Sequence, residues 1–141
     1  MTPEQQVIVQ TSFAKVAPIA DLAATIFYDD LFARDPRLRA LFKEDMTDQR
    51  QKLMSMLGTA VANLRHWEKI APAVQALGRR HVEYGVAPAD YDTVGAALIA
   101  TLGKGLGDDF TPEVREAWIA CYMAIVAEMM PADADATPSR E

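Results

Sequence analysis

One of the chain's two histidines stands where a core residue is expected. In the stretch QALGRRHVEYGV (75–86), His81 falls at helical spacing on a mostly apolar face. Its neighbours on that face are Ile70, Val74, Leu77 and Tyr84. A titratable ring in this position is either a core histidine hydrogen-bonded to a neighbour or a metal ligand. The pattern by itself favours the core histidine and leaves the metal ligand open.

The residue types exclude most other metal and catalytic sites. GKGLG at 103–107 has neither the spacing of a phosphate-binding loop nor a strand before it. Asn63 and Gly78 stand three residues before His66 and His81, so the Glu-x-x-His pair of a di-iron site is absent. A zinc site needs more histidines and cysteines, and no nucleophile motif supports a Ser/His or Cys/His pair. Haem is one of the few groups that two histidines still allow, because its iron needs one imidazole and keeps a sixth position for a diatomic gas.

Composition sets the class of protein. The 141 residues are half apolar and carry a net charge of −6, which suits one domain with one core. The basic residues form no stripe, so we expect no nucleic acid partner and no membrane partner. Cys121 cannot form an internal disulfide and lies in an apolar run, which indicates a buried thiol and a reducing compartment. With no signal peptide at the start and no apolar run long enough to span a bilayer, the sequence predicts a cytoplasmic protein.

Helix punctuation predicts an all-α domain of six or seven helices. Thr2-Pro3 and Thr111-Pro112 are typical N-terminal caps, Asp35-Pro36 ends the second helix, and Thr47 is expected to cap the third. Gly85 and Pro88 should end the His81 helix, and GLGDD at 105–109 should end the next. The second helix has apolar residues at three- and four-residue spacing, which are Ile19, Leu22, Ala23, Ile26, Phe27 and Leu31. The third helix is predicted to bury a stripe formed by Leu53, Met56, Leu57, Ala60 and Leu64.

Several motifs in order carry a family resemblance. They are TIFYDDLFARDP (25–36), RALF (39–42), the interval from Gln49 to Leu53, GRRHVEYGV with Tyr91 ten residues beyond its histidine, and AWIACY (117–122). From Thr2 to about Met130 the chain resembles the globins, specifically the bacterial single-domain type similar to the haem domain of flavohaemoglobins. The resemblance implies a globin fold of six to eight helices around a haem pocket. We expect a domain over 1–130 and a flexible tail over 131–141.

The resemblance assigns roles around a haem b group. His81 matches the proximal histidine, which binds the iron, and Phe42 matches the aromatic residue that wedges the haem. Tyr28 matches a distal tyrosine that donates to bound O₂, and Gln49 could donate to the gas or to Tyr28. Leu53 would line the pocket. The plainer alternatives are core packing for Phe42, Tyr28 and Leu53, and a solvated helix start for Gln49.

On the other side of the pocket the resemblance implies further contacts and one departure. Arg80 is a candidate partner for a haem propionate, with Lys52 a weaker one, and Val86 and Val94 are expected to line the pocket. Tyr91 matches a tyrosine that joins a carboxylate in polarising the proximal histidine. Alignment through AWIACY puts Asp133 nearest to that carboxylate, and Glu128 is the other candidate. Without either, His81 would bond to a carbonyl in the preceding turn.

These roles predict reversible binding of O₂ with slow release, as in an oxygen carrier, with NO and CO as further ligands. An alternative is nitric oxide dioxygenation with a separate external reductase, which is an activity of the resembled family. Gas or redox sensing through a partner is a third hypothesis. A haem-free helical regulator on the same fold is a fourth, which His81, Phe42, Tyr28 and Gln49 together argue against.

Overall fold

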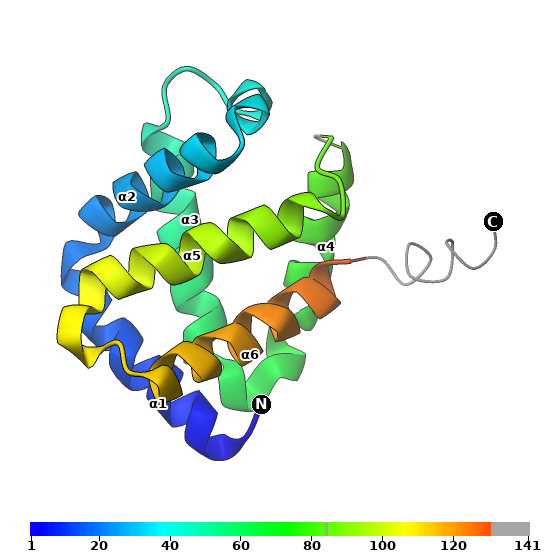
Figure 1. Ribbon diagram of the computed structural model, residues 1–141. Helices are drawn as coiled ribbons and strands as arrows, with labels where there is room; N and C mark the ends of the chain where they lie inside the picture. Colours follow the sequence, from blue (N-terminus) through cyan, green and yellow to red (C-terminus); the bar gives the residue numbers. More distant parts are fainter. Residues whose placement is uncertain (84, 131–141) are drawn as a thin grey trace.

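The computed structural model describes residues 1–83 and 85–130, and these form six α-helices joined by short 3₁₀ segments, with no strand among them (Figure 1). This confirms the predicted all-α class. The α-helices are α1 (Pro3–Val16), α2 (Ala20–Arg34), α3 (Thr47–Ala62), α4 (Ala71–Glu83), α5 (Asp90–Leu106) and α6 (Pro112–Met129). The 3₁₀ segments are η1 (Ala17–Ile19), η2 (Pro36–Leu41), η3 (Leu64–Lys69) and η4 (Gly107–Asp109). The predicted tail at 131–141 lies outside the described residues.

Side-chain caps begin two of the helices as the sequence predicts. The Thr2 hydroxyl accepts from the Gln5 backbone N–H while the Gln5 side chain accepts from the Thr2 N–H, which is a complete capping box. The Thr111 hydroxyl accepts from the Val114 N–H. The prediction for Thr47 is wrong, because Thr47 is the first helical residue and its own N–H donates to the Asp45 carboxylate. This backbone hydrogen bond lowers the pKa of Asp45.

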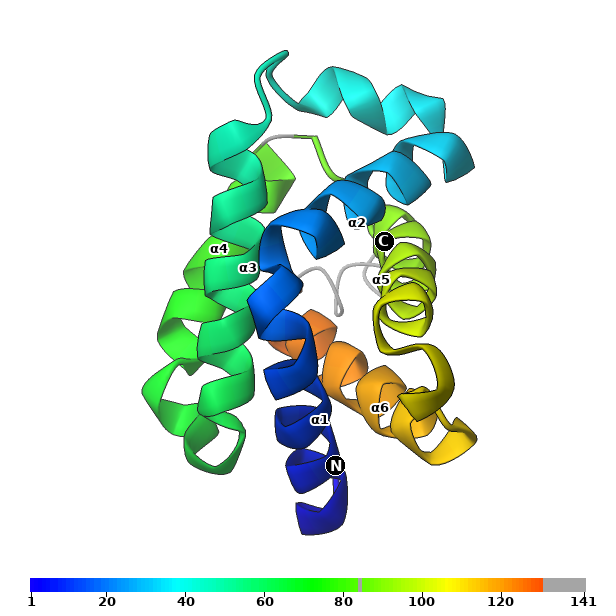
Figure 2. The ribbon, with the colours of Figure 1, turned by 90° about the vertical axis from the view of Figure 1, so that its left-hand side faces the viewer.

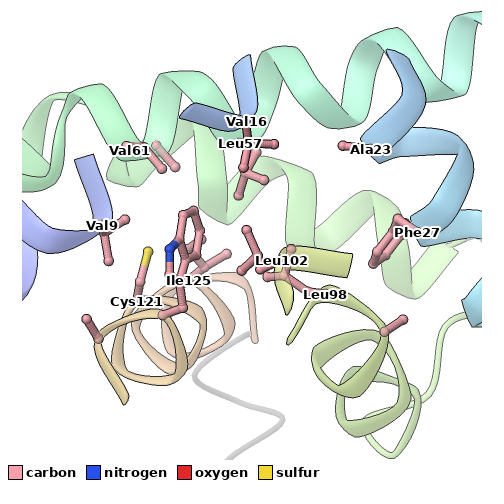
Figure 3. Close-up of a cluster of buried hydrophobic side chains, with 14 of the residues drawn as sticks. Val9, Val16, Ala23, Phe27, Leu57, Val61, Leu98, Leu102, Cys121 and Ile125 are labelled. Carbon is pink, nitrogen blue, oxygen red and sulfur yellow. The ribbon is translucent and has the colours of Figure 1, made fainter. Parts of the chain in front are cut away.

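A core of aliphatic and aromatic side chains lies where α1, α2, α3, α5 and α6 meet (Figure 3). Trp118 is fully buried at its centre, and its indole N–H donates to Ser12 over 2.8 Å. Cys121 is also fully buried, and this burial raises the pKa of its thiol to about 12. One predicted core residue is wrong, because Leu22 is 57% exposed. Its neighbours Ala23 and Phe27 carry the buried face of α2 in its place.

The two helices that should hold the pocket, α3 and α4, do not pack closely on each other. Figure 2 shows α3 and α4 on one side of the molecule and α5 and α6 on the other, with α1 and α2 running between them. The main contacts of α3 are with α2 and α1, whereas α4 packs on α6 and η3. Direct packing between α3 and α4 is at most slight. The two helices can therefore form opposite walls of a site.

The stretch Pro3–Arg34 is long and apolar enough to cross a membrane by length and composition alone. A helix in the core of a globular domain passes the same test. In the structure η1 divides this stretch, and α1 and α2 run in different directions on its two sides (Figure 1). Their inner faces pack into the core through residues such as Val9, Val16 and Phe27. Packing in the core of the domain therefore accounts for apolar residues of the stretch Pro3–Arg34.

A glycine sets the distance between α4 and α6. A Cβ placed on Gly78 would lie 1.8 Å from the backbone oxygen of Met129, so only glycine permits this approach. His81 follows Gly78 by three residues, less than one turn along the same helix. The Gly78 contact therefore fixes the position of the segment that carries the imidazole.

The Gly78→Ala variant should lower the free energy of unfolding by about 2 kcal/mol or more, because the new methyl group must push two backbones apart. Urea titration followed by circular dichroism measures the change. Gly58→Ala is the matched control, since its Cβ would lie 3.6 Å from the Phe13 ring, an ordinary contact. Alanine also favours a helix over glycine, so the control should be neutral or slightly stabilising. Equal stability of the two variants would contradict the role given to Gly78.

Candidate functional site

A hydrogen-bonded pair of polar side chains joins α2 to the first turn of α3. The Gln49 side-chain amide donates to the Tyr28 hydroxyl oxygen over 3.1 Å. Tyr28 is only 6% exposed and Gln49 is half-buried. The alternative prediction, that Gln49 is a solvated residue at a helix start, does not account for this hydrogen bond. Because Tyr28 accepts this hydrogen bond with its oxygen, its own O–H hydrogen stays available for another acceptor.

Burial keeps Tyr28 protonated. Loss of solvation raises the pKa of its phenol above the ordinary value of 10.0, although the hydrogen bond from Gln49 lowers the pKa to a smaller extent. The phenol is therefore neutral throughout the physiological pH range. A neutral phenol is a hydrogen-bond donor, which is the state that a distal donor requires.

Aromatic rings hold Tyr28 in place. Its ring meets Phe27 edge-to-face at 4.9 Å between centroids and Phe42 edge-to-face at 5.5 Å. Phe32 packs against both Tyr28 and Phe42, at 5.9 and 5.5 Å. We call Phe27, Tyr28, Phe32 and Phe42 the aromatic cluster. Phe42 follows η2 and is half-buried, so part of its ring remains outside the cluster and can contact a further group.

On α4, the His81 ring is oriented by its own helix. Nδ1 lies 2.8 Å from the Leu77 backbone oxygen one turn earlier, so Nδ1 carries the proton and donates it there. The other nitrogen, Nε2, then has a free lone pair, which is the form of imidazole that binds a metal. His81 is half-buried rather than fully buried, and it makes the hydrogen bond to a neighbour that the core-histidine alternative also requires.

The face around His81 is apolar and aromatic. The Tyr91 ring, at the start of α5, stacks on the imidazole at 6.5 Å between centroids and 23° between planes. Tyr91 is half-buried, and loss of solvation raises the pKa of its phenol. The Tyr122 hydroxyl of α6 donates to the Tyr91 backbone oxygen over 2.6 Å, which fixes the start of α5. Tyr84, predicted on the same face as His81, lies outside the described residues.

Glu128 forms different hydrogen bonds from the one that the resemblance suggested. Its two carboxylate oxygens accept from the Trp67 indole N–H over 2.9 Å and from the Gln75 amide over 2.5 Å. Glu128 therefore ties α6 to η3 and to the first half of α4, and its hydrogen bonds do not include His81. The alternative candidate, Asp133, lies outside the described residues. Among the described residues, the hydrogen-bond partner of the imidazole is a carbonyl rather than a carboxylate.

The two groups of side chains belong to one end of the molecule. The η2 segment and the turn between α4 and α5 lie at the same end in both views (Figures 1 and 2). They also approach each other directly, since the Leu41 side chain lies 3.8 Å from the position of a Cβ on Gly85. Gly85 has a φ of +92°, which allows the turn after α4. The η2 segment and this turn therefore lie beside each other, at the end of the molecule where α3 begins and α4 ends.

The remaining predicted residues border the same region to different degrees. Leu53 and Val94 are half-buried and pack against the core, and Leu53 also lines a small apolar cavity with Phe27 and Leu98. Val86 is half-buried in the turn after α4. Arg80 and Lys52 are exposed, and no hydrogen bond or ion pair within the described residues holds either side chain. Their roles toward a cofactor stay predictions.

The side chains available as metal ligands limit which metal group this site could hold. The described residues contain no cluster of three or more His, Cys, Asp or Glu side chains that could hold a metal ion. His81 alone offers a free imidazole nitrogen on a half-buried apolar face. A metal bound here must bring its other ligands with it, as haem iron does, and the half-buried Phe42, Leu53 and Val94 suit the faces of a porphyrin. The residues present fit haem.

Comparison with known proteins decides the family. The Globin family model matches residues 25–129, which is most of the chain. The chain belongs to the globin family. Haem is therefore its cofactor, as the sequence predicted, and the resemblance to the globins is confirmed.

The curated relatives are flavohaemoproteins. The one from Deinococcus radiodurans is 29% identical over 125 residues, which cover 86% of this globin and 31% of that protein. The one from Bacillus subtilis is 33% identical over 104 residues, which cover 70% of this globin and 26% of that protein. The chain thus spans about a quarter to a third of the length of the curated relatives it matches.

Solved structures confirm the fold. An engineered carbene transferase, made from a candidate nitric oxide dioxygenase of Rhodothermus marinus, matches with a TM-score of 0.86 at 22% identity, over 99% of this chain and 97% of that one. A flavohaemoglobin from Malassezia yamatoensis with bound FAD and haem matches with a TM-score of 0.75 at 22% identity, over 92% of this chain and 36% of that one. At this identity the likeness supports the globin fold and no finer property.

The chain's two histidines allow a matched test of haem ligation. His81→Ala should take up haem without the Soret and visible bands of an imidazole-ligated iron, and added free imidazole should restore them. His66→Ala is the control, because His66 is exposed on η3 and should leave the spectrum unchanged. A parent-like spectrum of His81→Ala without imidazole would exclude His81 as the ligand.

Proposed function

We propose that this globin binds O₂ reversibly and releases it slowly, as a carrier or store of the gas. Haem supplies the ferrous iron and the open coordination position at which a diatomic gas binds. The observation that carries the proposal is the Tyr28–Gln49 pair, in which the phenol is held by aromatic packing and keeps a free O–H hydrogen. The single cysteine, Cys121, supports a reducing compartment, and we place the protein in the cytoplasm.

Tyr28 and Gln49 have different hydrogen-bonding roles on the side of the site where the gas would bind. The Gln49 amide donates to the phenol oxygen, which orients the hydroxyl and makes its hydrogen a better donor. A hydrogen bond from this hydroxyl to a bound gas that carries partial negative charge contributes roughly 1.5–3 kcal/mol. The low exposure of Tyr28 limits competition from water for this hydrogen bond. Both residues therefore favour the bound gas over the free gas.

His81 supports the same reading from the other side. Its Nδ1 proton is shared with a neutral carbonyl, and the carboxylate of Glu128 is engaged by Trp67 and Gln75. A carboxylate partner would draw the proton away from the ring and increase the electron density at Nε2. A carbonyl does this less strongly. Reversible binding is favoured over cleavage of the O–O bond, which needs that electron density.

Tyr28→Phe should speed O₂ release by about ten- to a hundredfold, because it removes the hydroxyl and keeps the ring in the aromatic cluster. Stopped-flow displacement of O₂ by CO measures the rate. Gln49→Leu should accelerate release to a smaller extent. Gln51→Leu, an exposed position two residues further along α3, is the control and should leave the rate unchanged. An unaltered rate in Tyr28→Phe would remove this residue from the function.

A second candidate function is nitric oxide dioxygenation, in which NO and O₂ combine with one electron to give nitrate. The resemblance to the haem domain of flavohaemoglobins favours it, since this activity belongs to the resembled family and the curated relatives are flavohaemoproteins. Each turnover uses an electron, so a separate NADH-dependent reductase would have to act as partner. The retained O–H of Tyr28 serves this reaction as well, since it prolongs the residence of O₂.

Continuous NO consumption separates the two functions. With an NADH-driven flavin reductase supplied in excess, a dioxygenase should consume many equivalents of NO per haem, followed by an NO electrode, with nitrate as product. A carrier should consume about one equivalent and stop. The reaction without the reductase is the control and should give one equivalent in either case.

A further inference from the structure

Arg39 binds a segment that has no regular structure of its own. Residues 42–46 connect η2 to α3 outside any helix, so the carbonyl groups of Phe42, Lys43 and Glu44 accept no helical hydrogen bond, whereas that of Met46 accepts from the Arg50 N–H. One guanidinium fills this need for three successive residues. Nη1 of Arg39 donates to the backbone oxygens of Phe42 over 3.2 Å and Lys43 over 2.9 Å, and Nη2 donates to that of Glu44 over 3.0 Å.

The same guanidinium contacts the aromatic cluster. The Arg39 Cζ atom lies 5.5 Å from the centroid of the Phe32 ring, in a cation–π arrangement. Phe32 packs on Phe42 and on Tyr28. Arg39 therefore holds the backbone of Phe42 through hydrogen bonds and the neighbouring ring through its planar face.

The connector also determines where α3 begins. Glu44, bonded to Arg39, is followed by Asp45, whose carboxylate accepts from the Thr47 N–H at the start of the helix. Gln49 stands in the same first turn of α3 and donates to Tyr28. Two partners of the Tyr28 side chain, the Phe42 ring and the Gln49 amide, thus lie within or directly after the segment that Arg39 holds.

From these contacts we infer that Arg39 is a positioning residue of the gas site, which keeps Phe42 and Gln49 in place around Tyr28. The inference rests on the proposed function of Tyr28. It adds a residue whose hydrogen bonds go to backbone oxygens of the connector and not to His81 or Tyr28. Lysine cannot replace it, because an ammonium is a point charge without the planar fork that reaches several carbonyls and an aromatic face together.

The test compares Arg39→Lys with Arg37→Lys in the haem-loaded protein. Both variants keep the charge and both lie in η2, but the Arg37 side chain is 85% exposed and forms its ion pair within the described residues with Asp35. Hydrogen–deuterium exchange, followed by mass spectrometry, should be faster over residues 42–49 in Arg39→Lys, with α1 and α6 unchanged. Arg37→Lys should match the parent. Parent-like exchange over 42–49 in Arg39→Lys would overturn the inference, whatever the gas kinetics are.

Gas kinetics then test whether the position matters to Tyr28. Arg39→Lys should speed O₂ release by about three- to tenfold, a part of the effect of losing the hydrogen bond. It should also shift the C–O stretching band of the CO complex in the same direction as Tyr28→Phe does. In the Tyr28→Phe background, Arg39→Lys should change the release rate by less than about twofold, since coupled residues are not additive.

The outcomes separate the inference from the proposed function. Equal acceleration by Arg39→Lys with and without the Tyr28 hydroxyl would show that Arg39 acts elsewhere and would overturn the inference alone. If Tyr28→Phe releases O₂ like the parent, the proposed function fails, and the exchange data still decide whether Arg39 holds the connector.

Discussion

The approach of α4 to α6 at Gly78 is the constraint on which the site depends. The helix that carries His81 packs on α6 and η3 and little on α3, so its position is set from one side. Backbone contact at Gly78 allows the close approach, and Glu128 adds hydrogen bonds to Gln75 and Trp67 near the other end of the helix. Because α3 and α4 make at most slight contact, the position of the His81 helix does not depend on α3.

The two sides of the pocket are built by different means. On the α4 side, one backbone carbonyl orients the imidazole, and rigid helix packing does the rest. On the α2 and α3 side, the polar pair of Tyr28 and Gln49 depends on aromatic packing and on an irregular connector held by Arg39. The proposed iron ligand is thus fixed by a helix, whereas the side chains proposed to contact the gas depend on a connector that single substitutions can change.

Local sequence patterns predicted the helices well. Thr2 and Thr111 cap their helices because a cap involves residues within three positions of each other. The same reasoning failed at Thr47, where two residues close together, Asp45 and Thr47, can both serve as caps and the backbone decides between them. Leu22 was misplaced because helical spacing allows a wider apolar face than α2 buries.

The family motif named His81, Tyr28 and Gln49; the structure joins Tyr28 to Gln49, and the roles of the three residues toward a cofactor and a gas stay predictions. The hydrogen bonds of Glu128 and Arg39 were not predictable from the sequence. Glu128 meets partners that precede it by 61 and 53 residues, and no pattern along the chain indicates such pairs. Arg39 bonds to carbonyl oxygens, which every residue possesses, so its partners leave no mark in the amino-acid types. Only the folded connector reveals them.

The burial of Cys121 has a consequence for a protein that handles oxygen. Where O₂ meets a reduced metal, small amounts of peroxide and superoxide form, and they attack thiolates before other side chains. A thiol with no exposed surface and a pKa of about 12 gives them almost no thiolate to attack. Under the proposed function, this burial protects the thiol from sulfenic acid formation and from disulfide-linked pairing of two chains.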